Sequence, residues 1–281
     1  MDIVGISEDN LEDFSPFLGK DLTEDLKRIF YNGIGAIDGK GQAAGAFVYE
    51  LINCESEEDT KSRICMVKAG DRETADRLRD YYSGTSVKED GIFESFYKLT
   101  GEAEARSLEE IGFSLEKRED DTLEVSIGEL AETTIGKPKK LPDRVTNIER
   151  LSVLQFRDAV KKILFKGHNG IVEDISYLPK TWFDNDVSAC VSSGGIVSGL
   201  FLVRRTPSGV LIPVLFFACG PESNKNLLHM LRYSLKQAIQ RYPPETVVRI
   251  HRRSTSIKAL TDNILPGRAG KEIFFGVRKE K

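Results

Sequence analysis

Apolar residues recur along this chain with two periods, one typical of helices and one typical of strands. A spacing of three and four residues runs from Leu11 onward and again through residues 224–241, where Pro243 and Pro244 end it. Short apolar runs bounded by Gly, Pro, Asn and Asp lie between such stretches and predict strands. This alternation of strands and helices predicts an α/β fold, or α+β, with mixed sheets.

The first half of the chain is expected to start with a strand at residues 1–6, a helix within 11–29 and a hairpin at 37–48. Asp71 is a suitable N-cap for a later helix, and Gly112 a suitable end for another. The remaining elements are expected to be strands at 63–67, 92–99, 113–118 and 122–127, with helices after residue 71 and at 103–111.

The second half repeats this order. We expect a helix within residues 148–165, a hairpin, a strand at 210–218 and a helix at 224–241. A strand at 247–251, a short helix at 256–263 and a strand at 272–277 follow.

An offset of 154 residues superimposes the two hairpins. Three positions are then identical, and each of them lies in or next to the Gly-rich turn: Gly41 with Gly195, Gly45 with Gly199, and Phe47 with Phe201. Each copy is typical of a strand, a tight turn and a second strand. The shared order of elements around the hairpins favours an internal duplication.

Charge divides the chain unevenly. Residues 1–136 carry 15 basic and 32 acidic side chains, a net −17, whereas residues 137–281 carry 25 and 12, a net +13. The sign changes within the polar segment 131–147, which we interpret as a linker between domains 1–136 and 137–281. Such a split indicates halves that attract each other or a basic half that binds an anion, and a charged solvated surface is the simpler alternative.

Composition narrows the class of protein. With 40% hydrophobic and 30% charged residues, the sequence is typical of a globular protein. No apolar run approaches the length of about 18 residues that a membrane span needs, and residues 1–14 lack the pattern of a secretory signal. The four cysteines are isolated and there are three histidines, so we expect reduced thiols, no metal site and a cytoplasmic location.

The repeated order of helix, hairpin, strand, helix, strand, helix and strand resembles the GNAT family of N-acyltransferases. The most specific local match is residues 105–114, with Gly112 and Phe113 before the closing strands, and residues 210–237 match the family's fourth strand and cofactor-facing helix. The resemblance implies two tandem GNAT-like acyl-CoA N-acyltransferase folds. It also implies acetyl-CoA or another acyl-CoA as co-substrate, with a small-molecule amine or a peptide as acceptor.

The resemblance places the cofactor at the loop between that fourth strand and the next helix, where backbone N–H groups meet phosphates. The family's loop is rich in Arg and Gly, and neither half matches it: residues 219–226 include Glu222, which would repel phosphate. In the first half the loop is residues 68–72, which is shorter and brings an acid to the helix start, so domain 1–136 is expected to be non-catalytic. Domain 137–281 is the better candidate to bind acyl-CoA, although a simple turn and helix cap would explain the same residues. Its candidate cofactor-binding residues are Gly220, Ser223, Asn224, Lys225 and Asn226.

Transfer to an amine needs a base to take the amine proton. The family often uses a Glu on the fourth or a neighbouring strand and a Tyr in the last helix, but the strand at 210–218 has no ionisable residue and the helix at 256–263 has no Tyr. His251 and Glu222 are the remaining catalytic candidates, although a His at a strand end is more often a surface residue. Cys219 is expected to be a core thiol.

Two further classes of function stay open. Both halves could have lost acyl-CoA chemistry and serve as a non-catalytic ligand- or protein-binding module. Arg249, His251 and Arg253 would share one face of a strand and could bind an anion or dock on the acidic half. Nucleic-acid binding is not expected, because no helix-turn-helix, RNP-type or zinc motif accompanies these residues.

Overall fold

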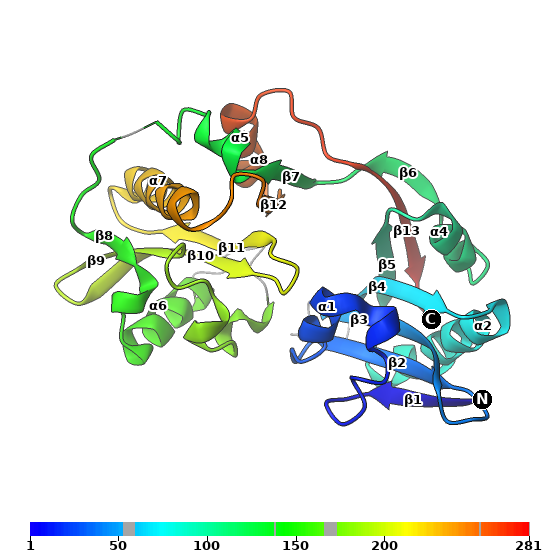
Figure 1. Cartoon of the computed structure of the whole chain (residues 1–281). Coiled ribbons are helices and arrows are strands. Elements are labelled where there is room, and N and C mark those ends of the chain that lie inside the picture. Colours follow the sequence, from blue (N-terminus) through cyan, green and yellow to red (C-terminus); the bar gives the residue numbers. More distant parts are fainter. Residues whose placement is uncertain (53–59, 138, 166–172, 253, 281) are drawn as a thin grey trace. The chain divides into compact units, whose positions relative to one another are not determined.

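The computed structural model describes residues 1–52, 60–137, 139–165, 173–252 and 254–280 of the chain (Figure 1). These residues form two α/β units, each built around one mixed sheet. Unit 1 comprises Met1–Asp120 together with Lys271–Lys281, and unit 2 comprises Asp121–Gly270. The two units are described separately below.

Unit 1 contains a sheet of seven strands in the order β1-β2-β3-β4-β5-β13-β6. The strands are β1 (Asp2–Ile6), β2 (Tyr31–Ile37), β3 (Ala43–Ile52), β4 (Lys61–Ala69), β5 (Glu94–Leu99), β6 (Glu116–Glu119) and β13 (Glu272–Lys279). The helices are α1 (Ser15–Asp25), α2 (Arg72–Tyr81), the π-helical turn η1 (Tyr82–Ser86), α3 (Val87–Glu89) and α4 (Glu102–Glu109). Only β4 and β5 run parallel among the paired strands of this sheet in the described residues.

Unit 2 contains six strands in the order β7-β12-β11-β10-β9-β8. They are β7 (Thr122–Ser126), β8 (Val145–Asn147), β9 (Ala189–Ser193), β10 (Ile196–Arg205), β11 (Leu211–Ala218) and β12 (Val247–His251). The helical elements are α5 (Ile127–Ala131), η2 (Ile148–Arg150), α6 (Val153–Phe165), η3 (Glu173–Ser176), η4 (Lys180–Trp182), α7 (Ser223–Arg241) and α8 (Thr255–Ile264). Here β11 and β12 form the parallel pair.

Each sheet has an apolar core on both faces, because its central strands are covered from two sides. In unit 2, Met230 and Leu235 of α7 belong to the core on one face, and Phe156 and Ile163 of α6 belong to the core on the other. Figure 1 shows α7 and α6 on opposite sides of this sheet. In unit 1, Leu78 of α2 lies in the core on one face, and α1 contributes to the core on the other.

The predicted duplication is confirmed in detail. The turn glycines of the two hairpins have nearly equal positive φ angles, 80° at Gly41 and 79° at Gly195, which is the left-handed region that favours glycine. The next glycine of each hairpin faces an alanine near the end of the following strand: Gly45 pairs with Ala69, and Gly199 pairs with Ala218. A register shift interrupts the same pair of strands in both units. The three identities therefore mark equivalent positions.

The observed division differs from the predicted boundary between residues 136 and 137. The chain passes from unit 1 to unit 2 between residues 120 and 121 and returns between residues 270 and 271, because the last strand of each sequence half belongs to the sheet of the other unit. Strand β7 directly follows β6 of unit 1 in the sequence, but it pairs with β12 of unit 2. Strand β13 follows unit 2 in the sequence, but it lies between β5 and β6 of unit 1. Both strands have ordinary strand patterns, so local sequence identified them as strands but not their partners.

The segment 131–147 is part of unit 2 rather than a linker between units. It follows α5, it ends in β8, and two of its residues, Ile135 and Val145, are buried in the α7-side core. Its two prolines and its charges are typical of a surface loop, and this segment crosses one unit instead of joining two.

The exchange of strands also redistributes charge. Unit 1 carries 30 acidic and 19 basic residues, a net −11, and unit 2 carries 14 and 21, a net +7. Acidic residues that precede residue 137 pair with basic residues that follow it inside unit 2: Glu124 with Arg249 at 2.8 Å, and Glu129 with Arg268. The attraction expected between the two sequence halves is present here as pairs within one unit.

None of the helices in the described parts of the chain is long and apolar enough to cross a membrane.

Candidate functional site

The parallel pair β11 and β12 of unit 2 separates early. Across the described residues the two strands are paired at one position, Leu211 with Val248, although β11 continues to Ala218. Beyond this point the two strands diverge toward their carboxyl ends, which is where α/β sheets commonly bind ligands. The opening lies beside the loop after the strand at 210–218, where the resemblance places the cofactor.

Two backbone N–H groups of β11 point toward this opening. The N–H of Cys219 donates to the Ser198 carbonyl at 2.8 Å, so Cys219 and Ser198 form a hydrogen-bonded pair of the antiparallel ladder. Hydrogen-bonded and non-hydrogen-bonded pairs alternate along such a ladder. Phe216 and Ala218 therefore belong to non-hydrogen-bonded pairs with β10, and their N–H groups face the β12 side.

The loop after β11 leads directly into the amino end of α7. Gly220 has a φ of 89°, and Ser223 begins a helix of 19 residues. The first N–H groups of such a helix have no partner within the helix, and its dipole favours an anion there. The predicted cofactor residues Gly220, Ser223 and Asn224 all lie at this end.

The other two predicted cofactor residues are turned toward β8. Asn226 is 4% exposed, and its side-chain oxygen accepts a hydrogen bond from Arg144 at 3.1 Å. The Lys225 ammonium donates to Glu222 at 3.2 Å. The contact with Arg144 occupies the Asn226 side chain, whereas the Lys225 side chain is 62% exposed. Lys225 and the backbone of the first turn are therefore the parts of α7 available to a phosphate.

Glu222 is a poor base in this setting. Hydrogen bonds and positive charge from Arg144 and Lys225 hold the pKa of its carboxyl below the usual value. A carboxylate stabilised in this way accepts a proton less readily. Glu222 is the N-cap residue of α7, and there its carboxylate balances the charges of Arg144 and Lys225.

His251 lies at the carboxyl end of β12, and its Nδ1 is 3.1 Å from the Thr122 hydroxyl oxygen on β7. Val248 and Ile250 contribute to the core beneath α7, so His251 faces the other side of the sheet, where α6 packs. This contact with Thr122 fixes the orientation of the His251 ring. It also bears on the tautomer, because the hydrogen bond of one ring nitrogen sets the protonation of the other.

A pocket of about 280 Å³ lies on that same α6 side of the sheet. Its wall is mostly apolar and is formed by α6, β10 and the end of β11, through residues that include Ala159, Ile163, Val197, Leu200, Phe217 and Cys219. Lys162 is the cationic residue of the lining. The pocket and His251 therefore share one face of the sheet, at the end from which β11 enters α7.

The equivalent opening of unit 1 is filled by the protein itself. β4 and β5 remain paired as far as Ile64 and Tyr97, and the N–H of Val67 then donates to the Glu104 carboxylate at 2.7 Å. Val67 corresponds to Phe216, because each lies opposite the shared hairpin phenylalanine. Burial raises the pKa of Glu104 above its ordinary value of 4.5, and the Val67 hydrogen bond opposes this shift. A carboxylate thus occupies the place that is open in unit 2.

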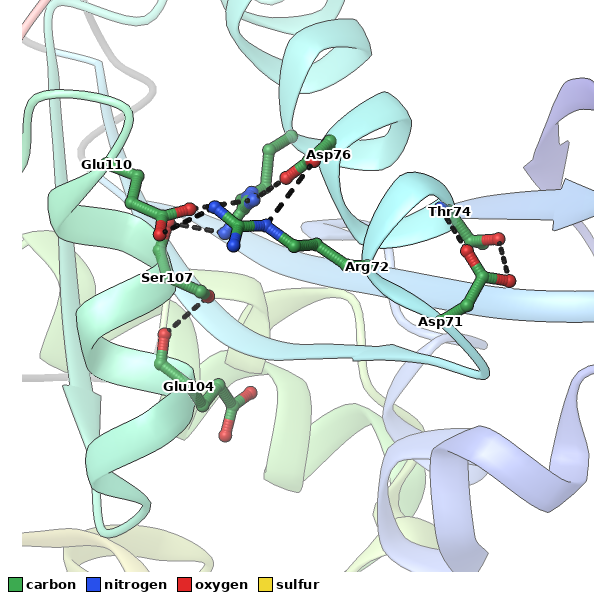
Figure 2. A network of polar contacts seen from close by, with 8 residues as sticks. Asp71, Arg72, Thr74, Asp76, Glu104, Ser107 and Glu110 are labelled. Carbon is green, nitrogen blue, oxygen red and sulfur yellow. Dashed lines mark hydrogen bonds and ion pairs between the residues drawn. The ribbon is translucent and has the colours of Figure 1, made fainter.

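A polar network holds α2 and α4 together in unit 1 (Figure 2). The Asp71 side chain accepts the Thr74 N–H at 2.8 Å, which confirms the predicted N-cap and places a carboxylate at the helix start. Arg79, whose side chain is 3% exposed, donates to the Ser107 carbonyl and pairs with Asp76 and with Glu110. These contacts join α2 to α4 within unit 1.

Sequence reasoning missed Arg144 and Glu104. Arg144 lies about 80 residues before its partners Glu222 and Asn226, as the separations of 78 and 82 show, and no local motif marks it. Glu104 looks like an ordinary acidic residue in the first turn of a helix. No sequence pattern indicates that Arg144 contacts α7 or that Glu104 accepts the Val67 N–H.

The basic cluster on β12 is largely neutralised within unit 2. Arg249 pairs with Glu124 across the ladder, and the Arg252 side chain, 6% exposed, pairs with Asp262 at 3.4 Å. The third predicted member, Arg253, lies outside the described residues. Within the described ranges no group of three or more His, Cys, Asp and Glu is placed to hold a metal.

Comparisons with known proteins fit this geometry. No family model matches the sequence, and no curated protein matches it by sequence. Solved structures match it over its full length. A tandem GNAT protein from the clavulanic acid biosynthesis pathway covers 100% of this chain and 98% of its own, with a TM-score of 0.60 and 9% identity.

Two GCN5-related N-acetyltransferases are similar as well. The protein from Kribbella flavida covers 99% of this chain and 71% of its own at a TM-score of 0.55 and 11% identity. The protein from Anabaena variabilis covers 100% and 73% at a TM-score of 0.53 and 13% identity. The chain therefore has the tandem GNAT fold, as the element order predicted. At these identities the likeness concerns the fold, and function is argued from the site.

Proposed function

We propose that this protein is an acyl-CoA-dependent N-acyltransferase whose cofactor lies in unit 2. The observation that carries the proposal is the difference between the two openings. The N–H groups of Phe216 and Ala218 face a separated pair of strands in unit 2, whereas Glu104 occupies the equivalent position in unit 1.

The opening of unit 2 suits an extended ligand that carries amides and phosphates. An exposed strand edge binds such a ligand through main-chain hydrogen bonds, and Phe216 and Ala218 provide donors at alternate positions. The amino end of α7 provides further donors and a favourable dipole for the pyrophosphate. Gly220 and Asn224 lie beside it without negative charge, and the carboxylate of the N-cap residue Glu222 is balanced by Arg144 and Lys225.

The pocket on the α6 side is proposed to bind the acceptor amine. Its mostly apolar wall favours an apolar primary amine over a highly charged one. The amine nitrogen attacks the thioester carbonyl, the carbon–sulfur bond breaks, and the thiolate leaves with the cofactor. His251 takes the proton that the amine loses, since it lies on the same face as the pocket and Glu222 is a weak base.

Unit 1 is proposed to be a non-catalytic copy. The Glu104 carboxylate and the cap at Asp71 would both repel phosphates, and the α2–α4 network closes the path between the helices. The alternative function, a binding module without chemistry, would keep the same fold but would need no base at His251.

Calorimetry with acetyl-CoA on the full-length chain tests the cofactor site. We expect one binding site per chain, and Asn224→Asp should weaken binding at least tenfold because it brings a carboxylate next to the phosphates. Gln240→Glu adds the same charge at the far end of α7 and serves as the matched control. Equal affinities of the two variants would place the cofactor elsewhere.

A second measurement separates catalysis from binding. With phenethylamine as an apolar acceptor, we expect acetyl-CoA-dependent release of free thiol. His251→Gln should keep acetyl-CoA affinity and lower the turnover by about 10²- to 10⁴-fold, the usual range for loss of a general base. Binding of acetyl-CoA with no thiol release from any amine would instead support the non-catalytic module.

A further inference from the structure

One side of α7 carries a stripe of basic side chains. Lys225, His229 and Arg232 are spaced four and three residues apart, so they lie above one another on a single helix face. Arg144, from the segment before β8, reaches the same face, since it hydrogen-bonds to Asn226 and to Glu222. The stripe therefore faces β8, at the edge of the sheet.

Several polar atoms in this stripe are buried without a partner. In the described part of the chain, Nε of Arg144, Nε and Nη1 of Arg232, and Nδ1 of His229 have no hydrogen-bond partner, and His229 is only 7% exposed. Folded proteins satisfy nearly all such donors, because each one left buried and unpaired costs free energy. Three of these four atoms are guanidinium donors, so the group that is missing is an acceptor.

The positive charge around these atoms favours an anion as the missing acceptor. Burial and the positive charges of Lys225, Arg144, Arg232 and Lys139 all lower the pKa of His229. The acidic group in contact with this cluster is Glu222, which bonds to Arg144 and Lys225 and is 45% exposed. Glu222 thus brings one negative charge to a cluster in which four cations act on His229. Because Glu222 is exposed, it can swing aside for a stronger anion.

We infer that Arg144, His229 and Arg232 form a phosphate-binding site that is separate from the acyl-CoA opening. Two guanidinium groups from different segments together offer the several donors that a phosphate accepts, and charge-assisted bonds from arginine are the strong ones. In the order β7-β12-β11-β10-β9-β8, the strand beside the stripe is three strands from β11, on the side away from the opening. The ligand is a small phosphorylated molecule, and Glu222 holds its place when it is absent.

The test uses pyrophosphate as the probe, with calorimetry on the full-length protein. Arg232→Met should lower the affinity at least tenfold, and the variant should stay folded because the arginine donates no hydrogen bond from its buried nitrogens in the free protein. Glu222→Gln should raise the affinity several-fold, because it removes the competing negative charge. Arg241→Met is the matched control, since Arg241 lies on the same helix and pairs with Asp186 at 2.7 Å.

Competition decides whether the site is separate. Because the amino end of α7 is proposed to bind the cofactor's own pyrophosphate, the site is measured by the part of the pyrophosphate binding that Arg232→Met removes. Saturating acetyl-CoA and saturating dephospho-CoA should both leave this part unchanged, and its displacement by both would assign the cluster to the cofactor's pyrophosphate and overturn the proposal. Displacement of pyrophosphate by acetyl-CoA but not by dephospho-CoA would assign the cluster to the cofactor's 3′-phosphate and overturn the proposal. An equal affinity in Arg232→Met and in the wild type would also overturn it. Failure of acetyl-CoA to bind would count against the proposed function alone, because pyrophosphate binding is measured without it.

Discussion

The Glu104 carboxylate accepts a hydrogen bond from the Val67 N–H at 2.7 Å, across the opening between β4 and β5. In unit 1 the backbone N–H at this position therefore has a partner within the protein, whereas the equivalent N–H of Phe216 in unit 2 faces the opening. Glu104→Ala should destabilise the protein by about 1–3 kcal/mol, because it leaves a buried N–H without a partner. Denaturant unfolding would measure the loss, and an unchanged midpoint would show that the opening is filled by something else.

The same carboxyl should make stability depend on pH. Its pKa is raised by burial, so its contribution is fully present below the ordinary value of 4.5 and is lost as the pH rises through the folded value. Glu104→Gln keeps the acceptor oxygen but cannot ionise. The unfolding free energy of the wild type relative to Glu104→Gln should therefore fall as the pH rises above the ordinary value of 4.5. A difference that stays flat as the pH rises would contradict the buried carboxylate.

The equivalent glycines of the two hairpins should tolerate a methyl group unequally. At Gly45 an added Cβ would lie 2.9 Å from the Lys68 carbonyl oxygen, which belongs to the backbone of β4. At Gly199 it would lie 2.9 Å from the terminal methyl of Met230, a flexible side chain. Gly45→Ala should cost about 1–3 kcal/mol of unfolding free energy, and Gly199→Ala should cost less. Denaturation midpoints for the two variants provide the comparison, and the reverse order would contradict it.

Arg79 and Arg72 provide a matched pair of arginines on α2. The Arg79 side chain is 3% exposed, whereas that of Arg72 is 79% exposed, and both contact Glu110. Arg79→Met should cost about 1–3 kcal/mol, because it removes a buried guanidinium that donates to the Ser107 carbonyl and pairs with Asp76 and Glu110. Arg72→Met should cost less than about 1 kcal/mol, as exposed ion pairs usually do. Thermal unfolding of the two variants checks this, and similar losses would show that the network of Figure 2 is not what joins α2 to α4.

Fragments of the chain should fold when they are cut at the ends of unit 2, and not when they are cut at residue 136, where the net charge changes sign. Residues 121–270 should fold alone, since they contain every strand of the second sheet. Residues 137–281 should not, because they lack β7 and α5 and carry β13 without its neighbours. Circular dichroism and cooperative unfolding would distinguish the two fragments. A cooperative transition in 137–281 and none in 121–270 would restore the boundary predicted at residue 136.

Much of this fold could be read from local sequence. The hairpin repeat was visible because Gly41 and Gly195 serve a turn that only a positive φ satisfies. The N-cap at Asp71 and the strand at Val247–His251 were visible for similar local reasons. The partners of β7 and β13 were not, because each pairs with a strand far away in the sequence, such as Thr122 with His251, and this leaves no mark in a strand's own pattern.

For the candidate site too, local features could be predicted from the sequence and contacts between distant residues could not. The loop from Gly220 to Asn224 was placed correctly at the end of β11, because the order of elements determines it. The surroundings of Glu222 and Asn226 depend on Arg144, which reaches them from a distant loop. Contacts between side chains that are far apart in sequence are set by packing, and no motif encodes them.

The exchange of β13 has a consequence for how the chain is made. A ribosome delivers the amino end first, so unit 1 would emerge with β5 and β6 each missing the neighbour that lies between them. All 150 residues of Asp121–Gly270 must follow before the missing strand is synthesised. During that time two strand edges of the nascent protein are open to wrong partners, and such edges are sites of aggregation. Chaperone dependence during synthesis should therefore concentrate on the half of the chain that is made first.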